Sequence, residues 1–567
     1  TGLMLKGPVY DTMIAASVID ENRMRYSLDA LSKDYLKDTK YKWDLRDRAL
    51  SQYGINDPMS NMHKLPYVLV KDYAEQDVSL TFRLWNLFNK NLDEIIYEPK
   101  RKSPRKIFNL ETRLFPCLVD MKFKGVKIDV EKTKEFGKFL ERRKHRLLQV
   151  IKNKTGIDVN IWAAASIKKL LEYLKVTDYE QTPKSKMPKL PKNYLQTHNN
   201  PLLRLIAKAR ECEKANNAFV EGLLSFVHNG RIHADINQIR SDQGGTVTGR
   251  FSMSNPNLQQ IPAKGWIGKK MRQIFIPEDN HTWASFDYSQ QEPRIVVHYA
   301  IKLLKNNPEL TQENRQKEHR DKFKQKIINS ISKMEKFYKQ NPDADFHQLV
   351  ADMAKIPRIQ AKTINLGMFY GMGKMKLQKE LNLNKEEAKD LFDKYHAEVP
   401  FVKKLSEELI EFAKDNELLF TLGDRFCRFD KWETTDKKWN NKIGRFNPVP
   451  LLTKDQAKTA YKAELLEENQ SDDPDYENIL YYYAPAFTYK ALNRLIQGSA
   501  ADMTKTAMVN LYEQGILPHI QIHDELCISV KDDIEISKIK NIMESALPLK
   551  IKNKVTCKKG NSWGSAK

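Results

Sequence analysis

The stretch HIQIHDELCISV, residues 519–530, places two acids between two short apolar runs. The runs HIQI and LCISV have the length and composition of buried strands. Between them lie His523, Asp524 and Glu525, at a position where a tight hairpin usually has Gly or Asn. Adjacent carboxylates repel each other when water is excluded. We therefore expect a β-hairpin whose turn carries a functional charge.

A second acidic stretch, WASFDYSQQEPR (283–294), has a similar layout. WASF is apolar enough for a strand, and Asp287 falls at its end. Ser289 and Glu292 fit the capping-box spacing of a helix start, and Pro293 would sit in the first turn, where a missing N–H costs least. Taken alone, this pattern favours an ordinary turn aspartate followed by a capping glutamate.

The two stretches together suggest a metal site. Each ends a strand with an aspartate, and two carboxylates from separate strands can hold two Mg²⁺ ions roughly 3.5–4 Å apart. Mg²⁺ prefers oxygen ligands and usually binds one or two carboxylates together with substrate phosphates. Because Asp287 and Asp524 would repel each other without cations, a metal is the simplest reason to bring them together.

A basic helix is predicted in IPRIQAKTINLGMFYGMG, residues 356–373. Arg358, Lys362, Leu366 and Tyr370 recur every four residues, so they drift only gradually around one side of the helix. Two cations near a helix N-terminus could clamp a triphosphate, with an apolar and an aromatic residue further along for a sugar and a base. The alternative is a basic surface helix. No acid stands four residues from either cation, which weighs against a simple salt-bridged face.

Composition bounds the function. The chain has 567 residues, 30% of them charged, with a net charge of +22 and a pI near 9.4. Several domains are expected at this length. The charge suggests a polyanionic partner, most simply nucleic acid, although a basic surface can also serve solubility.

The cysteine pattern and the lengths of the apolar runs argue against disulfide-rich, zinc-binding and membrane-spanning proteins. Five cysteines are scattered without a CxxC pair, which argues against a disulfide framework or a structural zinc site and favours a reducing interior. No run has the length of a membrane span, and the first residues do not resemble a signal peptide.

Five ordered segments resemble one family. The residues DYSQQEPR (287–294), RIQAKTINLGMFYG (358–371) and HDE (523–525) resemble motifs A, B and C of the family A DNA polymerases. TGRFSMSNPNLQQIP (248–262) and NRLIQGSAADMTK (493–505) resemble two further stretches of that family. The resemblance covers roughly residues 110–567, and the form of the first motif resembles the bacteriophage branch.

The resemblance implies an α+β fold, a right-hand polymerase with palm, fingers and thumb, preceded by a partial RNase H-like α/β exonuclease domain. The implied domains are a partial 3′–5′ exonuclease domain, 1–108; a thumb, 109–245; a palm segment with motif A, 246–300; fingers with a helical insertion, 301–430; and a second palm segment, 431–567, with an insertion at 430–485 and motif C.

The family also implies roles for single residues. Asp287, Asp524 and the Tyr288 carbonyl would bind two Mg²⁺ ions, for which Mn²⁺ can substitute, and Glu525 would be an accessory carboxylate. Lys362 would hold the triphosphate and protonate pyrophosphate. The remaining nucleotide contacts would be Arg358, Leu366, Tyr370, Glu292, His347 and Gln290, with Glu292 packed on Tyr370 against a ribose 2′-OH. The primer–template contacts would be Arg250, Asn493, Gln497, His523 and Gly371.

Three features depart from the family pattern. Leu366 stands where Phe or Tyr is usual, which predicts discrimination against dideoxynucleotides. Tyr489 stands where the family often has Arg, so one template contact is in doubt. The distance from Asp287 to His347 is about thirty residues longer than the resemblance implies, and the Lys-rich segment 301–342 would be an added helical element of the fingers.

The N-terminal part resembles the exonuclease domain of the same family. VYDTMIAASVIDEN (9–22) has Asp11 where the second exonuclease motif has its aspartate, and YAEQD (73–77) supplies Tyr73 and Asp77 in the Y-x-x-x-D form of the third. The first motif, an Asp-x-Glu on an early strand, is missing and is expected upstream of residue 1. We therefore expect poor proofreading from this chain.

The expected function is template-directed DNA synthesis, with replication of a phage genome as the first interpretation. A repair or lesion-bypass polymerase of the same fold is the alternative, and a non-catalytic DNA-binding protein is disfavoured because both aspartates are present. Expected partners are primer–template DNA and dNTPs, with a processivity factor or other replisome proteins as further candidates. A monomer without membrane contact, in the cytoplasm of a host bacterium, is expected.

Overall fold

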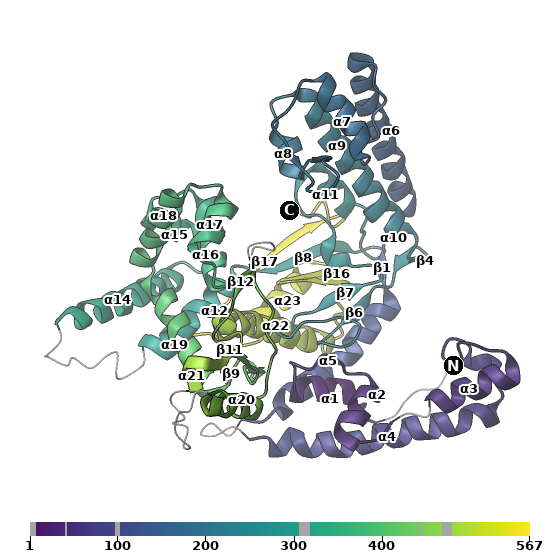
Figure 1. The fold of residues 1–567 in the computed structure, drawn as a ribbon, viewed down its shortest axis with the longest axis vertical. Helices are drawn as coiled ribbons and strands as arrows, with labels where there is room; N and C mark the ends of the chain where they lie inside the picture. Colours follow the sequence, from purple (N-terminus) through teal and green to yellow (C-terminus); the bar gives the residue numbers. More distant parts are fainter. Residues whose placement is uncertain are drawn as a thin grey trace.

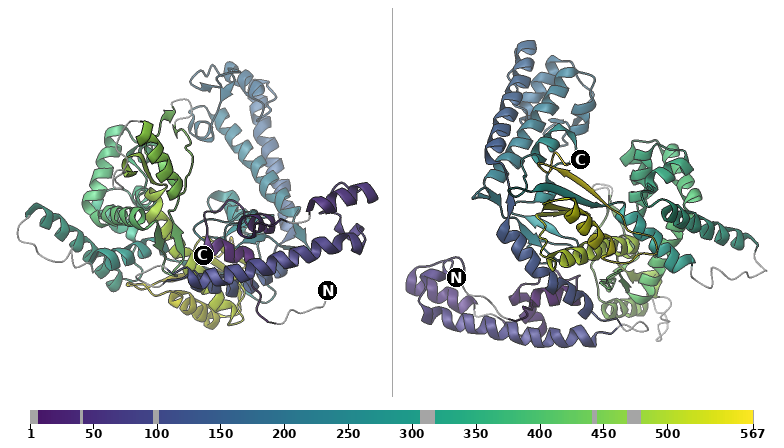
Figure 2. Two further views of the ribbon diagram at one scale, coloured as in Figure 1. Left: turned by 60° about the horizontal axis from the view of Figure 1, so that its bottom comes forward. Right: turned by 180° about the vertical axis from the view of Figure 1, so that it is seen from behind.

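The computed structural model describes residues 7–39, 42–96, 102–305, 318–440, 445–467 and 479–566. Two groups of helices rise from a central sheet, one on each side, and we call each group an upright. A third group, the N-terminal helices, lies beneath them (Figures 1 and 2). No helix in these described segments is long and apolar enough to cross a membrane.

The central sheet is antiparallel and four-stranded, in the order β15-β16-β8-β17. Asp287 on β8 pairs with Glu525 on β16 and with Thr556 on β17. β15 and β16 pair in antiparallel fashion with Ile522 opposite Glu525. The predicted hairpin is therefore confirmed, and both acidic stretches lie at one end of neighbouring strands. The strands are β8 (Thr282–Tyr288), β15 (Ile520–Ile522), β16 (Glu525–Val530) and β17 (Val555–Gly560).

Apolar helices cover one face of this sheet and make the main core. Phe286 of β8 and Leu526 and Ile528 of β16 are in the same buried cluster as residues of the covering helices, among them Met503 and Met543. This packing makes the sheet a rigid support for its loops. The helices are α12 (Gln291–Tyr299), α22 (Ala491–Tyr512) and α23 (Asp533–Ser545).

One upright, at the upper right of Figure 1, is built on two long helices that pack together. Asp129 caps the first of them by accepting the N–H of Lys132, and Gly156 ends it with φ of 72°. Its elements are α6 (Val130–Thr155), α7 (Ala164–Tyr173), β2 (Glu180–Gln181), β3 (Pro188–Lys189), α8 (Lys192–Thr197), α9 (Pro201–Ala215), η3 (Asn216–Glu221) and α10 (Gly222–Leu224).

The other upright, at the left of Figure 1, contains the predicted basic helix. The helix expected in the Lys-rich insertion exists and buries Ile331 and Tyr338 against the core, while residues 306–317 lie outside the described part. The elements are η5 (Ala300–Lys305), α14 (Glu318–Gln340), α15 (Phe346–Ala354), α16 (Arg358–Phe369), α17 (Lys374–Leu381), α18 (Lys385–Glu398) and α19 (Pro400–Asn416).

The segment 430–485, expected as an insertion or flexible loop, is folded wherever the structure describes it. Trp432, Tyr461 and Ile479 share a small core of their own; residues 441–444 and 468–478 lie outside the described part. The elements here and just before are β9 (Leu418–Phe420), β10 (Phe426–Arg428), β11 (Trp432–Thr434), β12 (Trp439–Asn440), β13 (Arg445–Phe446), α20 (Lys454–Glu467), α21 (Ile479–Tyr482), β14 (Tyr483–Pro485) and η6 (Thr488–Lys490).

Short strands and two small helices join the uprights to the sheet. In chain order they are β1 (Val126–Lys127), β4 (Val227–His228), β5 (Arg231–Ile232), β6 (Asp235–Asn237), β7 (Ser252–Ser254), η4 (Leu258–Gln260) and α11 (Gly265–Arg272).

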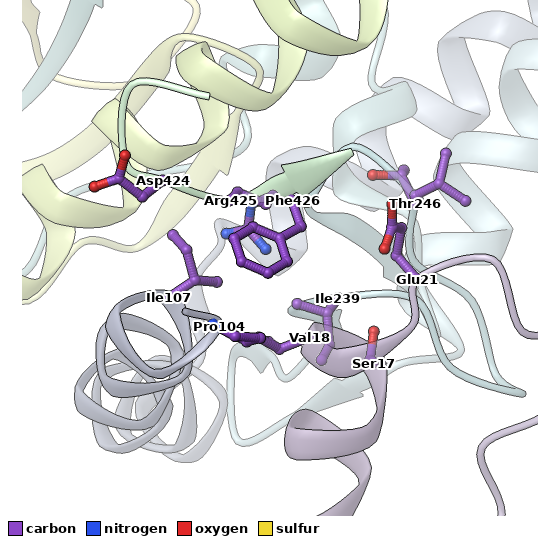
Figure 3. Close-up of a pocket in the computed structure, with 12 residues that line it drawn as sticks. Ser17, Val18, Glu21, Pro104, Ile107, Ile239, Thr246, Asp424, Arg425 and Phe426 are labelled. Atoms are coloured by element: carbon purple, nitrogen blue, oxygen red, sulfur yellow. The ribbon is translucent and has the colours of Figure 1, made fainter. Parts of the chain in front are cut away.

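The N-terminal helices pack on the underside of this assembly. Glu21 accepts hydrogen bonds from the backbone N–H of Arg428 at 2.6 Å and from its guanidinium at 2.5 Å. Figure 3 shows a small cavity where the N-terminal helices meet the rest of the chain. Its volume is about 10 Å³, and Glu21, Ile107 and Arg425 are among the residues that line it. The elements are α1 (Thr12–Ile19), α2 (Leu28–Leu31), η1 (Ser32–Leu36), α3 (Lys42–Tyr53), η2 (Met62–Lys64), α4 (Tyr67–Glu94) and α5 (Arg105–Lys124).

Candidate active site

Backbone pairing brings the two predicted metal-binding aspartates together. Asp287 ends β8 opposite Glu525, the first residue of β16. The Tyr288 N–H donates to the Asp524 carbonyl at 3.1 Å, and His523 has φ of 54°, which tightens the turn. The main chain therefore holds the hairpin turn beside the end of β8, whatever the two side chains prefer.

The electrostatics of this pair are unfavourable without a cation. Burial, together with the charges of Asp524 and Glu525, raises the pKa of Asp287 to about 8, against the opposing charges of Lys558 and Lys362. Burial also raises the pKa of Asp524 to about 6. Both shifts mean that the ionised pair lacks the solvation it would have in water.

The structure gives Glu525 and Tyr288 supporting positions. The Glu525 carboxylate accepts a hydrogen bond from Trp563 Nε1 at 3.1 Å and lies 3.9 Å from the Arg272 guanidinium. The sequence patterns predicted neither of these two partners. Tyr288 is 1% exposed, and its hydroxyl donates to the Met543 carbonyl at 2.7 Å. Because the side chain of Tyr288 is used in the core, its main chain is the part that can line the cavity.

A cavity of about 730 Å³ opens directly beside the aspartates. The stepwise pattern of α16 is confirmed, because its four predicted residues all line this cavity. Its walls come from β8, α12, α15, α16 and the hairpin turn, so distant segments converge on it. Its predicted lining residues are Arg250, Asp287, Tyr288, Gln290, Glu292, His347, Arg358, Lys362, Leu366, Tyr370, His523 and Asp524.

The Arg358 guanidinium has a carboxylate partner that the four-residue spacing did not reveal. Its Nε donates to Asp345 Oδ2 at 2.7 Å, across thirteen residues of sequence. Burial alone would raise the pKa of Asp345, but the hydrogen bonds from Arg358 and from two backbone N–H groups lower it. The predicted clamp is therefore partly neutralised when no ligand is present.

Glu292 is not a capping residue, so that part of the prediction was wrong. Helix α12 begins at Gln291, and its N-cap, Gln290, is left-handed with φ of 54° and makes no side-chain cap. The Glu292 carboxylate instead accepts the Tyr370 hydroxyl at 2.8 Å and forms an ion pair with Arg250. The expected contact with Tyr370 is confirmed, and Arg250 is drawn to the same carboxylate.

Gln290 lines the cavity, but its amide is used within the protein. Its Oε1 accepts the Phe346 N–H at 2.7 Å, and its Nε2 donates to the Ala344 carbonyl at 3.1 Å. The side chain therefore ties the loop after β8 to the start of α15. This arrangement favours a supporting role for Gln290 over direct contact with a nucleotide.

Of the other predicted DNA contacts, Gln497 approaches the hydroxyl of Tyr370 in the cavity wall, and Gly371 follows Tyr370 in the chain. Asn493 and Gln497 lie on α22, one turn apart on the same side. Gly371 has φ of 70°, and a Cβ there would come within 3.3 Å of the Tyr489 carbonyl. Tyr489 itself is 56% exposed, so its ring is accessible at the position where the family often has Arg.

Each of the three predicted exonuclease residues has different surroundings in the structure. Asp11 caps α1 by accepting the N–H groups of Met13 and Ile14. Asp77 lines a cavity of about 540 Å³ with Tyr10 and Thr12. Tyr73 packs against a small apolar cluster that α3 contributes to.

Within the described residues, no group of three or more His, Cys, Asp and Glu side chains is arranged to hold a metal ion. A metal at Asp287 and Asp524 would therefore need further oxygen ligands, and main-chain carbonyls and substrate phosphates are the usual sources.

Comparison with known proteins decides the family. The model of the family described as "DNA polymerase family A" matches residues 130–565. This span contains every element that lines the cavity. The chain belongs to DNA polymerase family A. The polymerase is therefore an enzyme, a DNA-directed DNA polymerase, and its fold is the right-hand fold of that family.

Two relatives and one solved structure illustrate the similarity. The polymerase is 30% identical to a "DNA-directed DNA polymerase" of Pseudomonas phage M6, over 98% of this chain and 79% of that protein. It is 27% identical to "DNA polymerase I" of Borreliella burgdorferi, over 98% of this chain and 53% of that protein. A solved structure of the M. smegmatis Pol1 POL domain, in complex with DNA primer-template and dNTP, matches with a TM-score of 0.68 and 22% identity, over 100% of this chain and 84% of that one.

Proposed function

We propose that the polymerase extends a DNA primer by two-metal nucleotidyl transfer and serves the replication of a phage genome. The observation that carries the mechanism is the pair Asp287, at the end of β8, and Asp524, in the adjacent hairpin turn, beside a cavity lined by Arg358 and Lys362. The phage role draws on the similarity to the polymerase of Pseudomonas phage M6.

The donor set fits Mg²⁺. The two carboxylates are half-buried, the charge of Asp524 raises the proton affinity of Asp287 when no cation is present, and the nearby Tyr288 carbonyl belongs to the same strand end. When bound there, two Mg²⁺ ions, or Mn²⁺ in their place, would activate the primer hydroxyl and stabilise charge on the leaving oxygen. Asp287 and Asp524 would hold them, with Glu525 outside the cavity, fixed by Trp563 and Arg272.

The cations of α16 would then bind the triphosphate. Arg358 and Lys362 are four residues apart and line the same cavity as the aspartates, so they would orient the phosphates toward the primer end. Lys362 is the group we assign to proton donation to the departing pyrophosphate. His347 lines the same cavity as these cations and would add a phosphate contact.

Sugar selection would depend on two residues further into the cavity. Glu292, held by Tyr370 and Arg250, would occupy the space that a ribose 2′-OH requires. Leu366 would contact the sugar through aliphatic carbons only. We infer selection for deoxynucleotides, and poor use of nucleotides that lack a 3′-OH.

The remaining assignments follow the same fold. We propose 109–245 as thumb, 246–300 and 431–567 as palm, and 301–430 as fingers, with Arg250, Asn493, Gln497 and His523 reading the minor groove of the primer terminus. The minor groove offers similar hydrogen-bond acceptors for every correct base pair, so contacts there test the shape of the base pair and not its sequence. We further propose that 1–108 is related to a proofreading exonuclease and that this chain removes 3′ mismatches poorly.

One experiment tests the central proposal. Asp524→Asn keeps the shape of the side chain and removes its charge, so primer extension should be lost while primer–template binding, measured by fluorescence anisotropy, is retained. Unchanged extension by this variant would refute the assignment of Asp524 as a metal ligand.

A further inference from the structure

His347 is held on three sides near the start of α15. It is 6% exposed, yet it lines the 730 Å³ cavity with Arg358 and Lys362. Asp345 Oδ1 accepts its backbone N–H at 2.9 Å, and the Phe346 ring lies edge-on to its imidazole with centroids 6.2 Å apart. The hydrogen bond fixes the main chain of His347, while burial and the Phe346 ring limit the space in which its imidazole can turn.

The remaining restraint comes from Asn365 on α16. Its amide Nδ2 donates to His347 Nδ1 at 3.0 Å, in a fully buried contact. Asn365 stands three residues after Lys362 and seven after Arg358, so all three lie on one side of the helix. One helix thus carries both predicted phosphate cations and the group that holds the neighbouring histidine.

Packing alone does not explain an amide at this position. Asn365 is 0% exposed, and its Oδ1 has no hydrogen-bond partner among the residues that the structure describes. A buried acceptor without a partner is destabilising, and a leucine of about the same size would avoid that penalty. The feature that leucine would lack is the N–H directed at His347.

Burial keeps the imidazole neutral. Burial is the main reason that the pKa of His347 is lowered to about 4; Asp345 opposes this shift, and the charges of Lys362 and Arg358 add to it. A neutral imidazole has one N–H and one lone pair. Because Nδ1 accepts from Asn365, the proton must be on Nε2, the nitrogen left for the cavity.

We propose that Asn365 is a positioning residue that fixes His347 in the Nε2–H tautomer, so that the ring presents a neutral hydrogen-bond donor to the phosphates of the incoming nucleotide. The inference rests on the proposed function, which places the triphosphate beside Arg358 and Lys362. A fixed neutral donor adds one further directional hydrogen bond to the two cations of the clamp.

The tautomer can be read directly by NMR of the full chain without nucleotide. Long-range ¹H–¹⁵N spectra of histidine-labelled enzyme should show His347 protonated at Nε2, and Asn365→Leu should produce a mixture of tautomers. Asn365→Asp should reverse the tautomer and raise the His347 pKa, because a carboxylate favours a proton on Nδ1. An unchanged tautomer in both variants would overturn the inference.

A double-mutant cycle tests the link to function. Asn365→Leu should raise the KM for dNTP by about three- to tenfold, the value of one neutral hydrogen bond, with kcat nearly unchanged. The effect should vanish in a His347→Ala background, with thermal melts to check that each variant is folded. Equal effects in both backgrounds would show a merely structural role and overturn the inference.

A separate result would identify failure of the proposed function. If His347→Ala leaves the KM for dNTP unchanged while Asn365→Leu shifts the tautomer, the phosphate role of His347 is wrong, although the control of its proton by Asn365 stands.

Discussion

Two aspartate sites in this chain are built in different ways. Asp287 ends a strand and Asp524 lies in the turn of the hairpin paired with it, so the backbone sets their separation. Asp11 instead caps α1 with its own carboxylate, and Asp77 lies on α4 beside a different cavity. The comparison shows that paired strands can hold two repelling acids together, whereas a carboxylate at a helix start can be used by its own helix.

The largest expected effect would test the strand-borne site. Asp287→Asn and Asp524→Asn should each lower single-turnover primer extension by about a thousandfold or more, because metal ions stabilise the transition state by several kcal/mol. Asp77→Asn is the matched control and should leave extension unchanged. Comparable losses in all three variants would remove the distinction between the sites.

The second prediction concerns the cavity beside the strand-borne aspartates. The wild-type enzyme should incorporate ddNTPs about tenfold less well than dNTPs, because Leu366 offers no hydroxyl to replace the missing 3′-OH. Leu366→Tyr should narrow this ratio, measured by competition on one primed template. Equal use of both nucleotides by the wild type would contradict the assignment.

A smaller effect is expected at Asp345, whose carboxylate competes with phosphates for Arg358. Asp345→Asn should lower the inhibition constant of pyrophosphate by about two- to fivefold, the range for a partly exposed ion pair. Asn is also a good N-cap, so α15 should be preserved. Weaker inhibition by pyrophosphate would indicate that Asp345 orients Arg358 for phosphate binding.

The smallest effect would test the N-terminal site. Asp11→Ala should lower the free energy of unfolding by about 1 kcal/mol through loss of a helix cap, and Asp11→Asn should be nearly neutral. Chemical denaturation measures both. Neither the wild type nor these variants should excise a 3′-mismatched primer efficiently, and brisk excision by the wild type would show that the N-terminal acids still form a working site.

Local sequence patterns predicted the catalytic elements well. The strand-turn-strand of residues 519–530 and the four-residue steps from Arg358 to Tyr370 appear in the structure as expected, because alternation and helical periodicity are local properties of the chain. The capping-box prediction failed for Glu292, because Arg250 and Tyr370 approach from distant segments and bind its carboxylate more directly than the helix N-terminus does.

Residues without a local signal escaped prediction. Nothing in DFHQL or KTINL indicates that Asn365 meets His347, since eighteen residues separate them, and helices α15 and α16 must pack before the amide can reach the ring. The same holds for Asp345 with Arg358 and for Trp563 with Glu525. Such partners depend on how elements pack, which periodicity does not specify.

The order and chemistry of the motifs were written in the amino-acid sequence: two strand-end aspartates, a helix with cations at four-residue steps, and a strongly basic chain. The tertiary structure alone decided which acids share a site. Antiparallel pairing sets Asp287 opposite Glu525 and beside Asp524, and partial burial lets the charges of Asp524 and Glu525 raise the pKa of Asp287. Long-range pairing and desolvation are properties of the folded chain, so no stretch of sequence read separately could contain them.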